Sequence, residues 1–408
     1  MSSSLISSIR SLRRLCRLSS LRVLLTLFLI WAIFDVLQKR FWLPTPITEK
    51  ERTLQGQPKI FVASIHWNTE AILRQSWNNA VIDLAKAVGP DNIFISIYES
   101  GSFDDSKGAL RELGRALDVL GVAHNITLSE TTHLDEISQK PEGAGWIRTP
   151  RGRDELRRIP YLARLRNISL QPLAELTKLG AKFDKVLFLN DVFFISEDVF
   201  TLLNTNNGEY AAACSLDFSK PPKYYDTFAL RDSKGHESVE QTWPYFRTSL
   251  SRHALEREKP VPVKSCWNGI VVMDARPFLS ERPLRFRGIS DTLALEHLEG
   301  SECCLIHADN PFSAVKGVYL NPKVRVGYNQ QAYDLVHSRP SWLSMYQIFT
   351  GLWSNRFKRW VTIQWLKEYV VRRRVSTWKE KDDTNVEPGV FCLINEMQVL
   401  VFNGWAHV

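Results

Sequence analysis

The chain has 408 residues, of which 44% are hydrophobic and 24% are charged, and these values are ordinary for a globular protein. Its formal net charge is +8. Residues 1–40 carry +6 of that charge, because they contain seven Arg and Lys residues and one acidic residue, Asp35. The +2 that remains for the rest of the chain is too small to indicate a nucleic-acid-binding surface, so we expect no nucleic-acid partner.

The N-terminal region predicts a membrane anchor. Residues 21–38, LRVLLTLFLIWAIFDVLQ, are mostly apolar and have about the shortest length that can span a bilayer. The basic residues within 1–20 favour a cytosolic tail, and no small-residue cleavage site is evident after the apolar segment. We therefore expect a signal-anchor at 21–38 and a stem at 39–57. The alternative is a short buried or amphipathic helix.

This arrangement predicts a single-pass type II membrane protein whose catalytic domain is luminal. A short span suits the thinner membranes of the early secretory pathway, so we expect the Golgi membrane. Five of the six cysteines follow the anchor, which fits an oxidising compartment and leaves at least one Cys unpaired or paired between chains. Sequons begin at Asn125 and Asn167, and Asn125 is the expected glycosylation site because Asn167 falls inside a predicted helix.

From residue 58 the chain alternates between two kinds of segment. Apolar runs of strand length alternate with segments of helical periodicity, with strands at 58–67, 92–100 and 183–194 and helices at 68–89, 105–121 and 158–180. This alternation predicts an α/β fold with a parallel sheet. After about residue 209 the pattern loosens into short strands and long loops.

Polar side chains follow three of the predicted strands. In an open parallel sheet, ligands bind beyond the carboxyl ends of the strands, so we expect donor contacts from Ser64, His66, Glu99 and Asn190. The first strand is not followed by G-x-G-x-x-G, and the chain contains no G-x-x-x-x-G-K-[ST]. The sequence therefore argues against a dinucleotide-dependent oxidoreductase and a P-loop NTPase.

Asp191 is the candidate ligand for a divalent cation. It lies between two apolar runs, where an unpaired carboxylate is costly and needs a partner. A hard cation such as Mn²⁺ or Mg²⁺ would neutralise the charge of a departing nucleoside diphosphate. His307 is the candidate second ligand, because a neutral imidazole suits Mn²⁺. The alternatives are that Asp191 caps a turn and that His307 is a hydrogen-bonded core residue.

Later segments add candidates for the acceptor and for catalysis. Trp267 and Asn268 lie at the edge of a short apolar run, and we expect them to contact the acceptor. Glu302 and Asp309 are candidate catalytic residues that would hold the acceptor hydroxyl or stabilise positive charge at the anomeric carbon. The alternative for Glu302 is an ordinary salt bridge.

Several of these segments resemble glycosyltransferase family 69, the fungal group of cryptococcal α-1,3-mannosyltransferase and capsule-associated proteins. The resemblance extends over roughly residues 58–335 and lies in blocks such as FLNDVFF, GEYAAACSLDF, PPKYYDTFALRD, VPVKSCWNGIVVMDA and HLEGSECCLIHAD. It implies a GT-A-like domain at 58–335, followed by a C-terminal extension at 336–408 that packs on it. It also implies a GDP-mannose donor, a Mn²⁺-type cofactor and retention at the anomeric carbon.

The same resemblance assigns two residues. Asp191 stands where the metal-binding acid of the family's D-x-D-type motif belongs, although the sequence here, Asn190-Asp191-Val192, offers one carboxylate instead of two. Arg166 lies on the helix before this motif, and the resemblance maps it to donor contact, a role for which the fixed geometry of a guanidinium is suited.

Together these features predict a metal-dependent retaining α-1,3-mannosyltransferase that acts on a mannose-containing glycan or glycolipid. Two alternatives stay open. The same fold could use another nucleotide sugar, or the protein could be a non-catalytic luminal protein that assists polysaccharide assembly or export.

Overall fold

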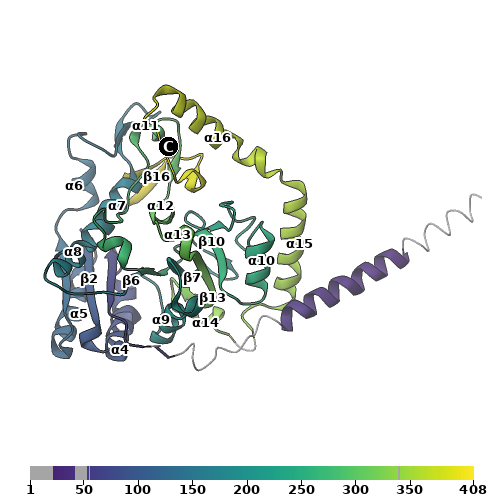
Figure 1. Ribbon diagram of the computed structural model, residues 1–408, viewed down its shortest axis with the longest axis horizontal. Coiled ribbons are helices and arrows are strands. Elements are labelled where there is room, and N and C mark those ends of the chain that lie inside the picture. The colour runs from purple at the N-terminus through teal and green to yellow at the C-terminus, as the bar shows by residue number, and fades with distance from the viewer. Residues whose placement is uncertain (1–21, 42–52, 55, 339–340) are drawn as a thin grey trace, which may run out of the picture.

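A computed structural model describes residues 22–41, 53–54, 56–338 and 341–408 (Figure 1). Residues 22–41 form a helix, purple in Figure 1, which extends from the body beside α15 (Met345–Val361). No helix in this described part of the chain is long and apolar enough to cross a membrane. Residues 22–38 of the predicted anchor lie within helix 22–41, and the membrane-spanning role of this segment stays a prediction. The predicted tail and most of the predicted stem lie outside the described residues.

A mixed sheet forms the centre of the molecule. Within the described residues it has ten strands in the order β3-β2-β1-β6-β11-β7-β13-β10-β9, with β8 paired to β7. Its parallel half consists of β3 (His124–Ser129), β2 (Ile93–Ser100), β1 (Ile60–His66) and β6 (Lys185–Leu189). Its second half consists of β11 (Ile270–Asp274), β7 (Ala212–Lys220), β13 (Val318–Gly327), β10 (Val261–Ser265), β9 (Arg231–Asp232) and β8 (Lys223–Tyr224).

The polarity of the sheet reverses where β11 runs antiparallel to β6. The predicted parallel sheet is therefore right for the first half, whereas the second half is mixed: β7 and β13 are parallel, but β11 and β10 run against their neighbours. This reversal brings the start of β11 to the same edge as the end of β6. The loop before β11 and the loop after β6 consequently meet.

Helices cover both faces of the sheet, so the strands read as continuous apolar runs. Ile60 and Val62 face one core, which contains α4 (Asn78–Val88), α5 (Ser106–Leu120) and α9 (Ser196–Leu203). Phe61 and Ala63 face the other core, which contains α7 (Arg158–Ser169), α8 (Gln171–Lys178), α10 (Ser249–Glu256), α12 (Glu302–Asp309) and α15. Shorter elements are α3 (Glu70–Ile72), α6 (His133–Ile137), β4 (Trp146–Arg148), β5 (Asp154–Leu156), α11 (Asp291–Ala294), α13 (Ser313–Lys316) and α14 (Gln330–Val336).

The predicted helices form, with two local differences. The segment 68–89 contains a π-helical turn, η1 (Leu73–Trp77), before α4, and it ends at Gly89, whose φ of 94° suits glycine. The segment 158–180 divides into α7 and α8 at Leu170, so that Pro172 stands in the first turn of α8, where a proline has no N–H to leave unpaired.

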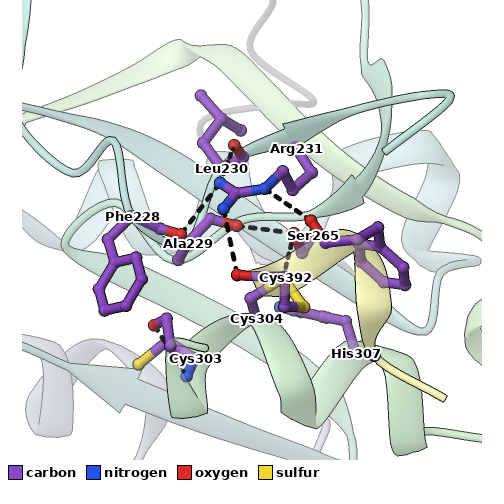
Figure 2. The surroundings of a disulfide bond; sticks show 12 residues. Phe228, Ala229, Leu230, Arg231, Ser265, Cys303, Cys304, His307 and Cys392 are labelled. Atoms are coloured by element: carbon purple, nitrogen blue, oxygen red, sulfur yellow. Dashed lines mark hydrogen bonds between the residues drawn. A yellow bond between two sulfur atoms is a disulfide. The ribbon is translucent and has the colours of Figure 1, made fainter. Parts of the chain in front are cut away.

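The C-terminal extension packs on the rest of the protein. It contains α15, α16 (Gln364–Lys381) and β14 (Leu393–Ile394), which pairs with β12 (Glu299–Gly300), and it ends in a hairpin of β15 (Gln398–Val401) and β16 (Gly404–His407). A disulfide joins Cys392 of this extension to Cys304 of α12 (Figure 2).

A buried arginine adds a second tether beside this disulfide. Arg231 donates to the carbonyl oxygens of Phe228 and Leu230 at 3.0 Å and to that of Cys392 at 3.2 Å, as Figure 2 shows. One guanidinium thus joins the loop before β9 to the C-terminal extension.

The remaining described cysteines and the sequons have clear environments. Cys214 and Cys266 form a second disulfide, and Cys303 is a buried free thiol, which accounts for the odd number of cysteines after residue 21. Asn125 is exposed on β3, whereas both amide atoms of Asn167 bond the backbone of Phe286. The predicted glycosylation of Asn125 stays a prediction.

Replacing both Cys304 and Cys392 by Ser should lower the free energy of unfolding by about 2–5 kcal/mol, because the bridge closes a long loop and its loss frees the unfolded chain. The two cysteines are 88 positions apart in the sequence. Urea denaturation of the double variant and the wild type without reductant measures this loss. Equal unfolding midpoints and slopes would contradict it.

Candidate active site

A pocket of ≈490 Å³ opens at the edge of the sheet where the polarity reverses. Asn190 reaches it from the end of β6, Trp267 from the loop before β11, and Tyr328 from the end of β13. The volume lies within the range of small-molecule binding sites. The pocket therefore lies at the carboxyl ends of β6 and β13, the position expected for ligands of such sheets.

Four of the residues predicted for the site meet in this pocket. Nε of Arg166 donates to Oε1 of Glu302 at 3.0 Å, and both side chains are almost fully buried. The guanidinium carbon of Arg166 lies 4.5 Å from the ring centroid of Trp267. The indole N–H of Trp267 in turn donates to Oδ1 of Asn190 at 3.2 Å. These contacts confirm that segments far apart in the sequence converge, and they leave the predicted roles as predictions.

Arg166 keeps its charge in this buried position. Burial alone lowers the pKa of its guanidinium, but the nearby Cys303 and Glu302 more than offset this effect, and the pKa is raised overall. Glu302 is thus held by a buried cation. The salt bridge that sequence analysis gave as its alternative role is present, and it lies in the wall of the pocket.

Asp191 follows the pocket residue Asn190 in the chain but does not itself line the pocket, and it has no cationic partner among the described residues. It forms no ion pair with any Arg or Lys that the structure describes, although the charge of Arg166 is close enough to act on it. Burial raises the pKa of Asp191 to about 6, against the opposing effects of a backbone N–H and of Arg166. A carboxylate in this state would be favoured in its charged form by an added cation.

The described residues do not form a complete metal cage. No group of three or more His, Cys, Asp or Glu side chains in the described ranges is arranged to hold an ion. His307 is buried, and its Nε2 donates to the carbonyl of Cys266 at 2.7 Å. Burial lowers the pKa of His307 to about 4, so the ring is neutral. This placement agrees with the core-histidine alternative, while Nδ1 of His307 is buried without a partner in the described part of the chain, and the metal-ligand role stays a prediction.

The placement of Asp309 also differs from the prediction. Its carboxylate makes a two-bond ion pair with Arg287, at 2.6 and 2.9 Å, and Arg287 pairs in the same way with Glu387. Asp309 does not contribute to the wall of the pocket. Asp309 therefore ties α12 to the loop before α11, and Arg287 of that loop, through Glu387, extends the contact to the C-terminal extension. The predicted catalytic role of Asp309 has no support from its placement.

Three predicted donor residues support the strand ends instead of lining the pocket. The hydroxyl of Ser64 donates to the carbonyl of Leu189 at 2.7 Å and lies 2.9 Å from Nε2 of His66. Burial lowers the pKa of His66 to about 3. Oε1 of Glu99 accepts from the N–H of Ser102, and its other oxygen is buried without a partner in the described part of the chain.

Asn268 is fully buried next to the pocket residue Trp267, where its side chain joins Asp217 to the backbone of Asp226. Its Nδ2 donates to Oδ1 of Asp217 at 2.9 Å and to the carbonyl of Asp226 at 3.2 Å. The hydroxyl of Tyr328 donates to Oδ2 of Asp217 at 3.1 Å. Burial and the charge of Asp226 raise the pKa of Asp217 to about 7. Asn268 thus supports the site instead of presenting its side chain to an acceptor.

Sequence analysis missed Asp217 and Asp226, and Asp226 lines the pocket. The block AAACSLDF places Asp217 in an apolar strand, which is the same signal that singled out Asp191. Sequence analysis also missed the wall formed by the C-terminal extension. Arg158 donates to Oε1 of Gln398 at 2.6 Å and lies 4.5 Å from the ring centroid of Trp405, and all three line the pocket.

Comparison with known proteins places the chain in a family. Residues 59–309 match the model of the family described as cryptococcal mannosyltransferase 1. The chain belongs to the cryptococcal mannosyltransferase 1 family. Within this family it is 26% identical, over 281 residues, to alpha-1,3-mannosyltransferase CMT1 of Cryptococcus neoformans var. neoformans, a match that covers 63% of this chain and 55% of the relative. The resemblance stated from the sequence is confirmed.

Solved structures give weaker similarities. The mannosyltransferase PcManGT from Pyrobaculum calidifontis, in complex with GDP-Man and Mn²⁺, has a TM-score of 0.36 at 10% identity, covering 90% of this chain and 87% of that chain. S. aureus TarS 1–349 has a TM-score of 0.37 at 11% identity, covering 80% of this chain and 83% of that chain.

The family match includes most but not all of the pocket. Arg166, Asn190, Asp226, Trp267 and Glu302 fall within residues 59–309, as does Asp191. The wall supplied by the C-terminal hairpin lies outside the matched segment.

His307→Gln should make the protein less sensitive to acid. The folded chain keeps His307 neutral with a pKa of about 4, against 6.5 for the ordinary group, so the unfolded chain takes up more protons below pH 6.5 and stability falls there. Between pH 7 and pH 5 this group costs the wild type roughly 2 kcal/mol, and Gln removes that loss while its amide still donates to Cys266. Urea denaturation of both proteins at the two pH values measures the difference. Parallel losses would contradict the core assignment.

Proposed function

We propose that this protein is a metal-dependent, retaining mannosyltransferase that moves mannose from GDP-mannose to a hydroxyl of a mannose-containing glycan or glycolipid, on a GT-A-like fold. Family membership supports the transferase class. The observation that carries the proposal is the pocket itself, where the buried Arg166–Glu302 pair lies against Trp267 and Asn190 beside the unpaired Asp191.

Positive charge on one wall suits the donor diphosphate. Arg158 and Arg166 both line the pocket, and guanidinium groups bind phosphate oxygens with defined geometry. The carboxylates of the pocket would repel a diphosphate if they acted alone. We infer that a Mn²⁺ or Mg²⁺ ion accompanies the diphosphate, held by Asp191 on the protein side and by phosphate oxygens and waters on the other, since one carboxylate suffices in sites of this kind. The bound ion would supply neutralisation of the leaving group.

Glu302 is the candidate for stabilising charge at the anomeric carbon. The ion pair with Arg166 holds its carboxylate in the pocket wall in one orientation. In the transfer, the bond from the anomeric carbon to the diphosphate oxygen breaks and the bond to the acceptor oxygen forms. The acceptor proton passes to the departing diphosphate on the same face, which accounts for retention. The chain's own contribution is then positioning and charge stabilisation.

The acceptor would bind among the aromatic side chains. Tyr225 and Tyr328 line the pocket with their ring centroids 4.7 Å apart, and Trp405 lines it from the C-terminal hairpin. Such faces suit the apolar sides of sugar rings.

We also propose that the domain is luminal in the Golgi, and the two disulfides support an oxidising compartment.

Asp191→Asn should abolish most of the metal-dependent activity. We expect transfer from GDP-mannose to fall by about 10²–10³-fold, because the neutral amide no longer balances the cation, and we expect GDP to lose its Mn²⁺-dependent stabilisation of the fold. Asp83→Asn, an exposed position on α4, is the control and should behave as the wild type. Transfer assays and thermal shifts with GDP or UDP, with and without Mn²⁺, measure these effects. Unchanged activity, or stronger stabilisation by UDP, would contradict the metal or donor assignment.

Arg166→Lys should raise the KM for GDP-mannose about tenfold, because a lysine cannot reproduce the planar contact to Glu302 and to a phosphate. Arg164→Lys is the matched control, since Arg164 lies two positions away on α7 and pairs with Glu136 outside the pocket. Steady-state kinetics of both variants test the assignment. Equal KM values for the two would argue against donor contact by Arg166.

A further inference from the structure

A row of large apolar side chains stays exposed along α15 and α16. These residues, which we call the α15–α16 ridge, are Phe357, Trp360, Val361, Ile363, Trp365 and Leu366. Trp360 is 69% exposed and Trp365 is 61% exposed. Figure 1 shows both helices running along the outer edge of the molecule. Soluble proteins rarely expose a contiguous apolar surface of this kind without a partner for it.

The spacing of these side chains gives each helix one apolar face. On α15, aromatic residues recur every three or four positions, at Tyr346, Phe349, Trp353, Phe357 and Trp360. This period places all five on one side of a helix. On α16, Tyr369 and Val370 lie next to the ridge and are also exposed. Aromatic rings with polar atoms at their edge are typical of surfaces that meet the boundary between water and lipid.

Positive charge borders the ridge. Arg373 is exposed about two helical turns beyond Leu366, on the same side of α16. It forms no ion pair among the residues that the structure describes. Burial, together with repulsion from Arg252, Arg356 and Arg247, lowers the pKa of Arg359 to about 10. Arg356 pairs with Asp35 and Arg252 lies 3.9 Å from Glu256, whereas Arg247 and Arg359 form no ion pair among the described residues. The positive charge of Arg247, Arg359 and Arg373 therefore favours an anionic partner.

The ridge is continuous with the N-terminal helix. Asp35 of helix 22–41 pairs with Arg356 of α15 at 2.6 Å, and the ring centroids of Phe28 and Trp353 are 4.9 Å apart. The exposed side chains of helix 22–41 are themselves apolar over most of its length. Two neighbouring helical surfaces therefore present apolar side chains, with basic residues between them.

The ridge also adjoins the wall of the candidate active site. Ser354 and Lys358 of α15 bond Glu240 at 2.7 and 3.1 Å, and Lys367 of α16 pairs with Glu237. Glu237 and Glu240 both line the pocket. A surface bound along the ridge would consequently lie next to the pocket.

We propose that the α15–α16 ridge is an interfacial docking face that lies on an anionic lipid bilayer and holds the pocket at the membrane surface. Aromatic and aliphatic side chains would enter the boundary of the acyl chains, and the bordering arginines would meet anionic headgroups. A second copy of the chain is the less suitable occupant, because the bordering arginines of one copy would then have to meet those of the other. If the proposed transfer activity holds, this placement favours a lipid-linked acceptor.

The test compares two triple variants of the full chain. Trp360→Ser, Trp365→Ser and Leu366→Ser together remove the centre of the ridge. The matched control replaces Val119, Leu179 and Val315 by Ser, which are exposed by 88%, 85% and 83% but are not part of the ridge. Co-flotation with vesicles of phosphatidylcholine, with or without phosphatidylserine, gives the partition coefficient of each protein, and circular dichroism with thermal melting confirms that each is folded.

We expect the ridge variant to partition about tenfold less onto anionic vesicles than the wild type, and the control to stay within about twofold. Arg373→Glu should weaken partitioning onto anionic vesicles alone, and added salt should do the same. Equal partitioning of the ridge variant and the wild type would overturn the proposal. Any vesicle binding would then be due to helix 22–41. A dimer that the ridge variant dissociates, with vesicle binding unchanged, would also overturn it and assign the ridge to a second copy. None of these readouts depends on transferase activity.

Discussion

The buried ion pair between Arg166 and Glu302 is the interaction on which the arrangement of the pocket depends. It joins α7, beside the parallel half of the sheet, to α12, which lies in the chain between β11 and β13 of the mixed half. Removing either partner would leave an uncompensated buried charge, at a cost of about 3–5 kcal/mol. The two helices must therefore stay in register, and the guanidinium, fixed in this way, supports the ring of Trp267 and through it the side chain of Asn190.

The second structural element of the pocket is supplied by the C-terminal extension, and α12 is the point of attachment. Glu302 and Cys304 lie two positions apart on this helix, so they point to different sides of it. One takes part in the pocket wall and the other forms the disulfide to Cys392, which Arg231 reinforces through backbone carbonyls (Figure 2). A single short helix thereby connects the polar site to the segment that encloses it.

The electrostatics of the pocket support the proposed divalent cation. Carboxylates outnumber guanidinium groups on its walls, and the carboxyl groups of Asp191 and Asp217 both have pKa values raised by burial. An arrangement of this kind disfavours a bare diphosphate and favours a diphosphate that brings a divalent ion. The basic border of the α15–α16 ridge has the opposite charge, so the two neighbouring surfaces suit different ligands.

The alternation of apolar runs and amphipathic segments was sufficient to predict the parallel half of the sheet, because both of its faces are covered and the strands therefore read as continuous apolar runs. The motif blocks likewise predicted the family. The roles of individual polar side chains depended on tertiary contacts: His307 and Asp309 carry the residue types of a site, yet one bonds a core carbonyl and the other pairs with Arg287. Asp226, between β8 and β9, is held at the pocket by Asn268 in the loop before β11, a contact that the local sequence does not show. Local sequence encodes burial and periodicity, whereas the partner of a polar atom lies on another segment, 41 residues away for His307, 22 for Asp309 and 136 for Arg166.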